Sequence, residues 1–481
     1  MAASRRAAKE AAEEAEKAQN FNNRYIAKTI MKAKKAGDTP FPSNEIESLV
    51  DIAKRVVAEN FHMYPHLKGV ENEQILDDIT KVTDYDLPIT VTARNINQEF
   101  YWEEKCKRDP RMKNVKKEQH GNSYKQAYIE VYIQNLLENL RSDNVSQLIK
   151  DLDAVRYEVF SLTIGELQHF KVSELFDYLP NLAFLKLTYG AKHVGMQYER
   201  PMFGMKMSDA IDFSQCLRTT SSLTHLALPG NLIDDELTKY LVSELMLNKT
   251  ISQLDLSHNK IGNQGARKIA KYILQTQILT HLNLGDNCIS YDGSRFLAQA
   301  LKVNKSLISL DLKLNRLNDK AGSKLCIDLL NNDSGLHFLG LSSNELDNMF
   351  AESLAEFLKM NENINAVDIS CNVIQESAAA TLKDSLIGNP NITEIDVRSN
   401  QFTAQTVHEI NEIVTKNHLK KKQITYHNMS DCKFYSAIDL CRYREGDPDD
   451  RGVHEGWKQA GAAGGAQRRR GRPEVKPNNS D

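Results

Sequence analysis

One leucine-rich pattern dominates this sequence and occurs seven times at an almost constant interval. A typical copy places its apolar residues at Leu307, Leu310, Leu312 and Leu317, with Asn315 between the last two. The asparagines of successive copies are 28 or 29 residues apart and form the series Asn231, Asn259, Asn287, Asn315, Asn344, Asn372 and Asn400. So regular a period predicts stacked copies of one structural unit instead of a single globular core.

Each copy predicts a short strand followed by a helix. The Leu-x-Leu alternation has the two-residue period of a strand. The apolar residues after it, at Ile269 and Ile273 in one copy, have the spacing of a helix face. This combination is a leucine-rich repeat. We expect an α/β fold, a horseshoe-shaped leucine-rich-repeat solenoid with a parallel inner sheet and outer helices, preceded by a small helical domain.

The seven asparagines are expected to form a structural ladder through the array. Backbone groups leave the sheet where each strand turns toward its helix, and an unpaired buried polar group costs about 1–3 kcal/mol. A side-chain amide carries both donors and an acceptor, so it can satisfy such groups. We therefore expect one buried asparagine in each repeat.

Composition and spacing divide the chain into six regions. They are an Ala/Lys/Glu-rich helical extension (1–40), an N-terminal helical domain (41–150), a degenerate repeat with a cap and a Met-rich insertion (151–222), seven regular leucine-rich repeats (223–416), a C-terminal cap (417–442) and a disordered Arg-rich tail (443–481). In the helical domain we expect helices over 44–60 and 71–82, an extended stretch over 87–93, and a helix opened by the capping box Ser123-x-x-Gln126. Residues 155–162 are expected to form the first strand.

Two features are candidate partner surfaces. The insertion carries Met196, Met202, Phe203 and Met205, and inserted loops in solenoids often bind partners; the alternative is that this loop folds back over the array. An acidic stripe along the strands contains Asp255, Asp311, Asp368 and Asp396, which could attract basic partners. Aspartate is also common at this position of the generic repeat, which favours a structural role.

The sequence contains no catalytic or cofactor-binding motif with a supporting context. Phosphate-binding glycine loops and the His-Glu-x-x-His zinc motif are missing from it. We expect no enzymatic activity, no cofactor, no metal site and no small-molecule substrate. The formal net charge of -3 favours neither nucleic acid nor membrane as a partner. The cluster Arg468, Arg469, Arg470 and Arg472 is compatible with a nuclear signal, although a solvated tail is the commoner explanation.

The chain is expected to be intracellular and soluble. Its first 18 residues lack the apolar core of a secretory signal, and Glu13, Glu14 and Glu16 argue against a mitochondrial leader. Seven scattered cysteines suit a reducing compartment.

Motifs outside the regular repeats resemble one family. They are Leu87-Pro88-Ile89-Thr90-Val91-Thr92-Ala93, Tyr101-Trp102 with Cys106, His120-Gly121-Asn122-Ser123-Tyr124-Lys125, Asn135-Leu136-Leu137, and Gly195-Met196-x-Tyr198 with Cys216. Together these segments resemble the leucine-rich-repeat subunit, number five, of the nexin-dynein regulatory complex, also called the t-complex-associated testis-expressed family. The repeats themselves resemble the ribonuclease-inhibitor type.

The resemblance implies a non-catalytic scaffold in the axoneme of the motile cilium or flagellum, within the cytoplasmic cytoskeleton. There it would help link doublet microtubules and regulate dynein-driven motility. The implied partners are other subunits of the complex, both coiled-coil and leucine-rich-repeat, with tubulin and dynein as further candidates. The alternatives are a Ran-type activator of a small GTPase, whose acidic C-terminal tail has no counterpart here, and an inhibitor module richer in cysteine and tryptophan.

Overall fold

The computed structural model describes residues 48–428, apart from 68, 142–143, 169, 192–198, 200–201 and 331–334. The expected extension (1–40) and the Arg-rich tail (443–481) therefore lie outside the described residues. The chain divides into two compact units, Met1–Asn60 and Phe61–Asp481. The described part of the first unit is one helix, α2 (Leu49–Glu59), whose first turn is capped by the Ser48 hydroxyl accepting from the Asp51 amide.

A parallel sheet of nine strands, in the order in which the strands follow along the chain, organises the second unit. The strands are β1 (Ser161–Leu167), β2 (Phe184–Tyr189), β3 (His225–Ala227), β4 (Gln253–Asp255), β5 (His281–Asn283), β6 (Ser309–Asp311), β7 (Phe338–Gly340), β8 (Ala366–Asp368) and β9 (Glu394–Asp396). Equivalent leucines pair in register across neighbouring strands, for example Leu226 with Leu254 and Leu254 with Leu282. The repeat period therefore sets the register of the sheet.

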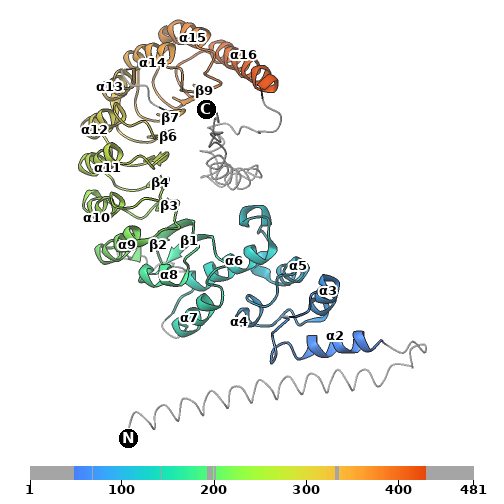
Figure 1. Cartoon of the computed structure of the whole chain (residues 1–481). Coiled ribbons are helices and arrows are strands. Elements are labelled where there is room, and N and C mark those ends of the chain that lie inside the picture. Colours follow the sequence, from blue (N-terminus) through green and yellow to red (C-terminus); the bar gives the residue numbers. More distant parts are fainter. Residues whose placement is uncertain are drawn as a thin grey trace, which may run out of the picture. The chain divides into compact units, whose positions relative to one another are not determined.

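Helices return the chain from the end of each strand to the start of the next, because parallel neighbours need a crossover connection. They are α8 (Val172–Tyr178), α9 (Met207–Thr219), α10 (Asp235–Leu245), α11 (Asn263–Gln275), α12 (Tyr291–Leu301), α13 (Asn318–Leu330), α14 (Asn348–Met360), the short η4 (Glu376–Ala378) and α15 (Ala379–Gly388); α16 (Ala404–Asn428) follows the last strand. In Figure 1 the strands of the regular repeats line the inner side of a curved array, and the helices line the outer side. The expected α/β leucine-rich-repeat solenoid is confirmed.

The core lies between the sheet and these helices. Leu254, Leu256 and Ile261 of one repeat are fully buried against Ile269 and Ile273 of its helix. Burial of a leucine or isoleucine contributes about 1.5–3 kcal/mol relative to exposure. Because neighbouring repeats share one continuous set of buried side chains, stability accumulates along the array.

A helical region precedes the sheet, as expected. It contains α3 (Glu73–Val82), α4 (Ile89–Thr92), α5 (Glu99–Arg108), η1 (Pro110–Met112), η2 (Lys117–His120), α6 (Tyr124–Glu138) and α7 (Val145–Ala154). Ser123 caps α6 by accepting from the Gln126 amide. The Ser123 amide donates to the His120 carbonyl and not to the Gln126 side chain, which itself donates to Glu130, so the expected capping box is not complete.

Two local predictions for this region are wrong. The stretch 87–93 was expected to be extended, but it forms the short helix α4 with Pro88 as its N-cap. A proline disfavours helix only for the residue before it, and Ile89, Thr92 and Ala93 gain burial in the helical form. The first strand begins at Ser161 instead of residue 155. Val155 and Val159 are buried in the turn after α7, so their apolar character reflects core packing and not strand pairing.

Candidate interaction surfaces

The seven asparagines lie at equivalent places and join successive repeats. Asn259 donates from Nδ2 to the Leu228 carbonyl at 2.9 Å, and its Oδ1 accepts from the Ile233 amide at 3.0 Å. The same pair of bonds recurs at Asn287, Asn315, Asn344, Asn372 and Asn400. Asn231 likewise donates to the Leu187 carbonyl, but its Oδ1 accepts from the Tyr189 amide, a different position of the preceding repeat. The bond that Asn344 accepts lengthens to 3.4 Å where the interval between asparagines is 29 residues. Each amide thus satisfies backbone groups of the preceding repeat.

A second asparagine ladder lies 17 residues farther along the chain, just after the helices of four repeats and within α16 in the last. It consists of Asn248, Asn304, Asn361, Asn389 and Asn417. Asn304 donates to the carbonyls of Ile273 and Thr276 and accepts from the Leu307 amide. Sequence analysis missed this ladder because Thr276 interrupts its series. The constant offset of 17 residues from the first ladder was the signal that could have found it.

The four aspartates of the acidic stripe make a common backbone contact. The Oδ1 atoms of Asp255, Asp311, Asp368 and Asp396 each accept from the amide two residues later, at 2.9–3.0 Å. Asp255 and Asp311 are only 7% and 6% exposed. Burial is the main reason why the pKa of Asp368 is raised. The structure thus gives these carboxylates a local role at the strand ends, and their use as a partner surface stays a prediction.

The described end of the insertion packs on the array. Met196 lies outside the described residues, Met202 and Phe203 are half-buried, and Met205 is buried. The Met205 amide donates to the Asn231 carbonyl at 2.8 Å. Gly204, at φ +81°, sits so close to that carbonyl that a Cβ would lie 2.8 Å from its oxygen. Residues 203–205 therefore fold back onto the array, whereas the use of Met196 and Met202 as a partner surface remains a prediction.

Two glutamates of α6 cover the edge of the sheet at β1. Glu130 is buried, and its Oε1 accepts from the amides of Phe160 and Ser161 at 2.9 and 2.8 Å. Its other oxygen lies 2.6 Å from Nδ1 of His120. Glu138 accepts from the Gly165 amide at 3.0 Å. Edge amides would otherwise be free to pair with another chain, so α6 ends the array without a further strand.

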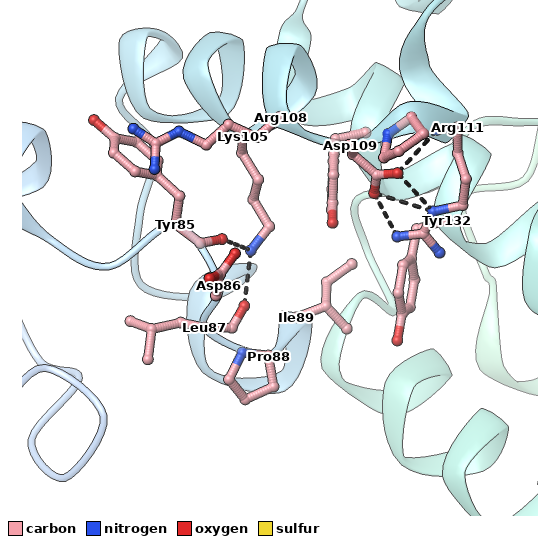
Figure 2. A pocket seen from close by; sticks show the side chains of 12 residues that line it. Tyr85, Asp86, Leu87, Pro88, Ile89, Lys105, Arg108, Asp109, Arg111 and Tyr132 are labelled. Carbon is pink, nitrogen blue, oxygen red and sulfur yellow. Dashed lines mark hydrogen bonds and ion pairs between the residues drawn. The ribbon is translucent and has the colours of Figure 1, made fainter. Parts of the chain in front are cut away.

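A pocket of about 340 Å³ opens in the N-terminal helical region, outside the repeats (Figure 2). Its lining residues are Tyr85, Asp86, Leu87, Pro88, Ile89, Lys105, Arg108, Asp109, Pro110, Arg111, Tyr128 and Tyr132. Lys105 is 5% exposed and donates from Nζ to the carbonyls of Tyr85 and Leu87 at 2.9 and 2.7 Å. Sequence analysis did not single out this pocket.

Aromatic rings surround the cations of this pocket. Nζ of Lys105 lies 5.3–6.0 Å from the ring centroids of Tyr101, Trp102 and Tyr128. The Arg108 guanidinium lies 4.1 Å from the Tyr85 ring centroid, and that of Arg111 lies 5.2 Å from the Tyr132 centroid. Burial lowers the pKa of Lys105 to about 8, against the opposing effect of nearby Asp86, Asp84 and Asp109.

Within the described ranges, no three His, Cys, Asp or Glu side chains gather as a metal site would require. Among the helices that the structure describes, none is long and apolar enough to cross a lipid bilayer.

Comparisons with known proteins agree with the geometry. A family model described as Leucine Rich repeat matches residues 247–270, 277–298 and 303–326. Dynein regulatory complex subunit 5 of Chlamydomonas reinhardtii is 34% identical over 197 residues, which cover 40% of this chain and 50% of the relative. The chain is a leucine-rich-repeat protein related to dynein regulatory complex subunit 5.

Mammalian subunit 5 proteins match a similar share of the chain. The mouse protein is 26% identical over 238 residues, covering 43% of this chain and 47% of the relative. The human protein is 26% identical over 241 residues with the same coverage. The chain spans about half the length of the curated subunit 5 relatives it matches.

Solved structures align with this chain only at low identity and low TM-score. The tropomodulin C-terminal domain from Caenorhabditis elegans is 13% identical and aligns with a TM-score of 0.30 over 34% of this chain and 99% of its own. The leucine-rich-repeat domain of LRIM1 is 18% identical, with a TM-score of 0.31 over 62% of this chain and 86% of its own. TM-scores this low indicate nothing about the function of this chain.

Proposed function

We propose that the chain is a non-catalytic scaffold subunit of the nexin-dynein regulatory complex in the motile ciliary axoneme. There it helps to link doublet microtubules and to regulate dynein-driven motility. The observation that carries this proposal is the similarity to proteins named dynein regulatory complex subunit 5 in an alga and in mammals. Its location would be the axoneme of the cilium or flagellum, within the cytoplasmic cytoskeleton.

The architecture supports a scaffold role because the array presents a preformed surface. Nine parallel strands and two asparagine ladders hold the backbone of the array in place before any partner binds. A rigid surface binds at a lower ordering cost than a flexible one. Several partners can then be held at fixed spacing along the repeats.

The partners we propose are other subunits of the complex, both coiled-coil and leucine-rich-repeat, together with tubulin or dynein. The strand face bearing Asp255, Asp311, Asp368 and Asp396 is one proposed contact surface. The insertion, through Met196 and Met202, is another. Small-molecule substrates, nucleic acid and membrane lipids are not among the partners proposed.

Affinity purification from ciliated cells tests this assignment. Axonemes from cells expressing a tagged chain would be cross-linked, extracted with salt, purified on the tag and analysed by mass spectrometry. We expect other subunits of the regulatory complex to be the main proteins recovered. Recovery of a small GTPase in their place, together with accelerated GTP hydrolysis by the purified chain, would contradict the proposal.

A further inference from the structure

The pocket beside α5 contains a buried cation without a carboxylate partner. Lys105 is 95% buried, since 5% of it is exposed, and two backbone carbonyls accept from its ammonium. No carboxylate in the described part of the chain lies within 4.0 Å of this ammonium. An ammonium has three N–H donors, so one remains beyond the two carbonyl contacts. Asp86, Asp84 and Asp109 act on this cation only from a distance. A buried cation without an anion in contact is costly, which favours an anionic group at this place.

A second cation at the rim is already oriented for an anion. The guanidinium of Arg108 is held 4.1 Å from the Tyr85 ring centroid, and it makes no ion pair with any residue that the structure describes. Arg111 differs, because its guanidinium already binds Asp109 through Nε at 2.9 Å. A stacked guanidinium loses less freedom when it binds a planar anion, and its donors match both oxygens of a carboxylate.

The remaining wall of the pocket is apolar. Leu87, Pro88 and Ile89 line it next to Lys105, as Figure 2 shows. The charged lining comprises three cations (Lys105, Arg108 and Arg111) and two carboxylates (Asp86 and Asp109), a balance of plus one. A free inorganic anion could use the cations but not this apolar wall. An acidic peptide segment that also carries an apolar side chain could use both.

We propose that this pocket is a docking site for an acidic segment of a partner protein, in which a glutamate or aspartate side chain binds Arg108 and Lys105. An adjacent apolar side chain of that segment packs on Pro88, which is exposed, whereas Leu87 and Ile89 beside it are buried. The site lies outside the repeats and provides a contact independent of the strand face. It does not depend on membership of the regulatory complex, because the pocket belongs to the chain whatever assembly contains it.

Binding of defined peptides to the purified full-length chain tests the proposal. The probe is a fluorescein-labelled peptide of alternating glutamate and leucine, measured by fluorescence anisotropy. We expect the same peptide with glutamine in place of glutamate to bind about tenfold more weakly, because charge-assisted hydrogen bonds become neutral ones. A peptide with glutamate but no leucine should also bind more weakly, because the apolar wall stays uncovered.

Variants locate the binding at this pocket. Arg108→Gln should weaken binding of the glutamate-leucine peptide by about tenfold. Lys268→Gln, which removes an exposed cation from α11, is the matched control and should bind as the unchanged chain does. Arg108 is exposed, so an unchanged melting temperature is expected and would show that the variant folds.

Three results would overturn the proposal. They are no measurable binding of the glutamate-leucine peptide at millimolar concentration, equal binding by Arg108→Gln and the unchanged chain, and equal competition by inorganic phosphate and the unlabelled peptide. The last result would show a simple anion site. None of them bears on recovery of the chain with regulatory-complex subunits, so failure here is distinguishable from failure of the proposed function.

Discussion

At the scale of the residue, every regular repeat turns through one left-handed position directly before its ladder asparagine. These positions are Gly230, His258, Asp286, Leu314, Ser343, Cys371 and Ser399, with φ between 52° and 66°. Only the first is glycine, although a left-handed conformation costs other residues about 1–2 kcal/mol each. The array tolerates this strain because the turn brings the asparagine into the ladder.

Leu314 tests that strain most clearly. It is 48% exposed and has φ 53°, so its replacement by glycine relieves the backbone while removing little packing. We expect Leu314→Gly to raise the free energy of unfolding by roughly 0.5–1 kcal/mol in urea denaturation, after the entropy cost of glycine. Val303→Gly is the control, since Val303 is exposed and lacks a positive φ, and it should destabilise by about 0.5–1 kcal/mol. If Leu314→Gly instead lowers the free energy of unfolding, the left-handed backbone at this position is not strained.

The ladder amides should contribute far more than exposed amides. Asn287 donates to the carbonyls of Leu256 and Leu284 and accepts from the Ile261 amide, each at 3.0 Å. Asn287→Ala leaves these buried groups unpaired, so we expect a loss of about 2–4 kcal/mol in the free energy of unfolding. Asn411→Ala, at an exposed site on α16, should change it by less than about 0.5 kcal/mol. Equal effects of the two would refute a structural role for the ladder.

Lys105 should make stability depend on pH. Its folded pKa of about 8 lies below the ordinary value of 10.5, so the unfolded chain binds more protons between these values. Stability therefore rises with pH in that window, and the penalty for burying the charge is present in full below it. From pH 7.5 to about pH 9.5 we expect Lys105 itself to contribute a gain of roughly 2 kcal/mol in the free energy of unfolding. This gain is read as the difference from a variant that cannot titrate there, because burial also raises the pKa of the Cys106 and Cys216 thiols and so lowers stability over the same range.

Urea denaturation at both pH values, beside Lys105→Met, isolates this effect. The variant cannot titrate at this position and should lack the gain. Its stability is expected to be lower at both pH values, because the Tyr85 and Leu87 carbonyls lose their donor. Burial raises the pKa of Tyr101, which lowers stability only at higher pH. An equal pH dependence in both proteins would show that Lys105 is not the cause.

At the scale of the element, α6 ends the sheet by replacing a missing strand. Glu130 supplies acceptors for two amides at the edge of β1. We expect Glu130→Ala to destabilise the protein by about 2–4 kcal/mol, because a charged acceptor is lost from a buried site. Amide hydrogen exchange should accelerate over residues 160–167. Glu166→Ala, on the exposed side of β1, is the control and should leave the exchange rates unchanged. If both variants accelerate exchange equally, α6 does not protect the edge of the sheet.

Prediction from sequence succeeded where one interaction repeats with a constant period. The spacing of Leu254 and Leu256 is enough to place a strand, because copies at 28-residue intervals must stack in the same register. Prediction failed where tertiary contacts determine the local secondary structure. The β-branched stretch at residues 89–92 favours a strand by propensity, yet burial of Ile89 and Thr92 makes it helical.

The pocket and the capped edge could not be predicted from the sequence for a related reason. Lys105 meets the Leu87 carbonyl across 18 residues, and Glu130 meets Ser161 across 31. Neither pair recurs at a fixed interval, so no pattern marks it. The aspartates of the stripe were visible in the sequence, but their backbone contacts depend on where each strand ends.

At the scale of the whole molecule, one continuous core joins the helical region to the last repeats, from Phe61 to Val414. In an array of this kind each repeat is held by its neighbours, so stability depends on contacts that continue from repeat to repeat. Such an array suits a scaffold subunit that holds several partners at fixed distances while neighbouring doublet microtubules slide past one another. The pocket near one end and the strand face along the array would then be separate contacts of the same scaffold.

Extraction of axonemes tests the scaffold role most directly. Cilia from the source cell would be stripped of membrane with detergent and extracted with increasing salt, and this chain would be quantified by mass spectrometry beside tubulin and dynein. We expect it to remain with the axoneme at a fixed ratio to tubulin and to leave together with other regulatory-complex subunits. Release with the soluble matrix, or absence from cilia, would contradict a scaffold role in the axoneme.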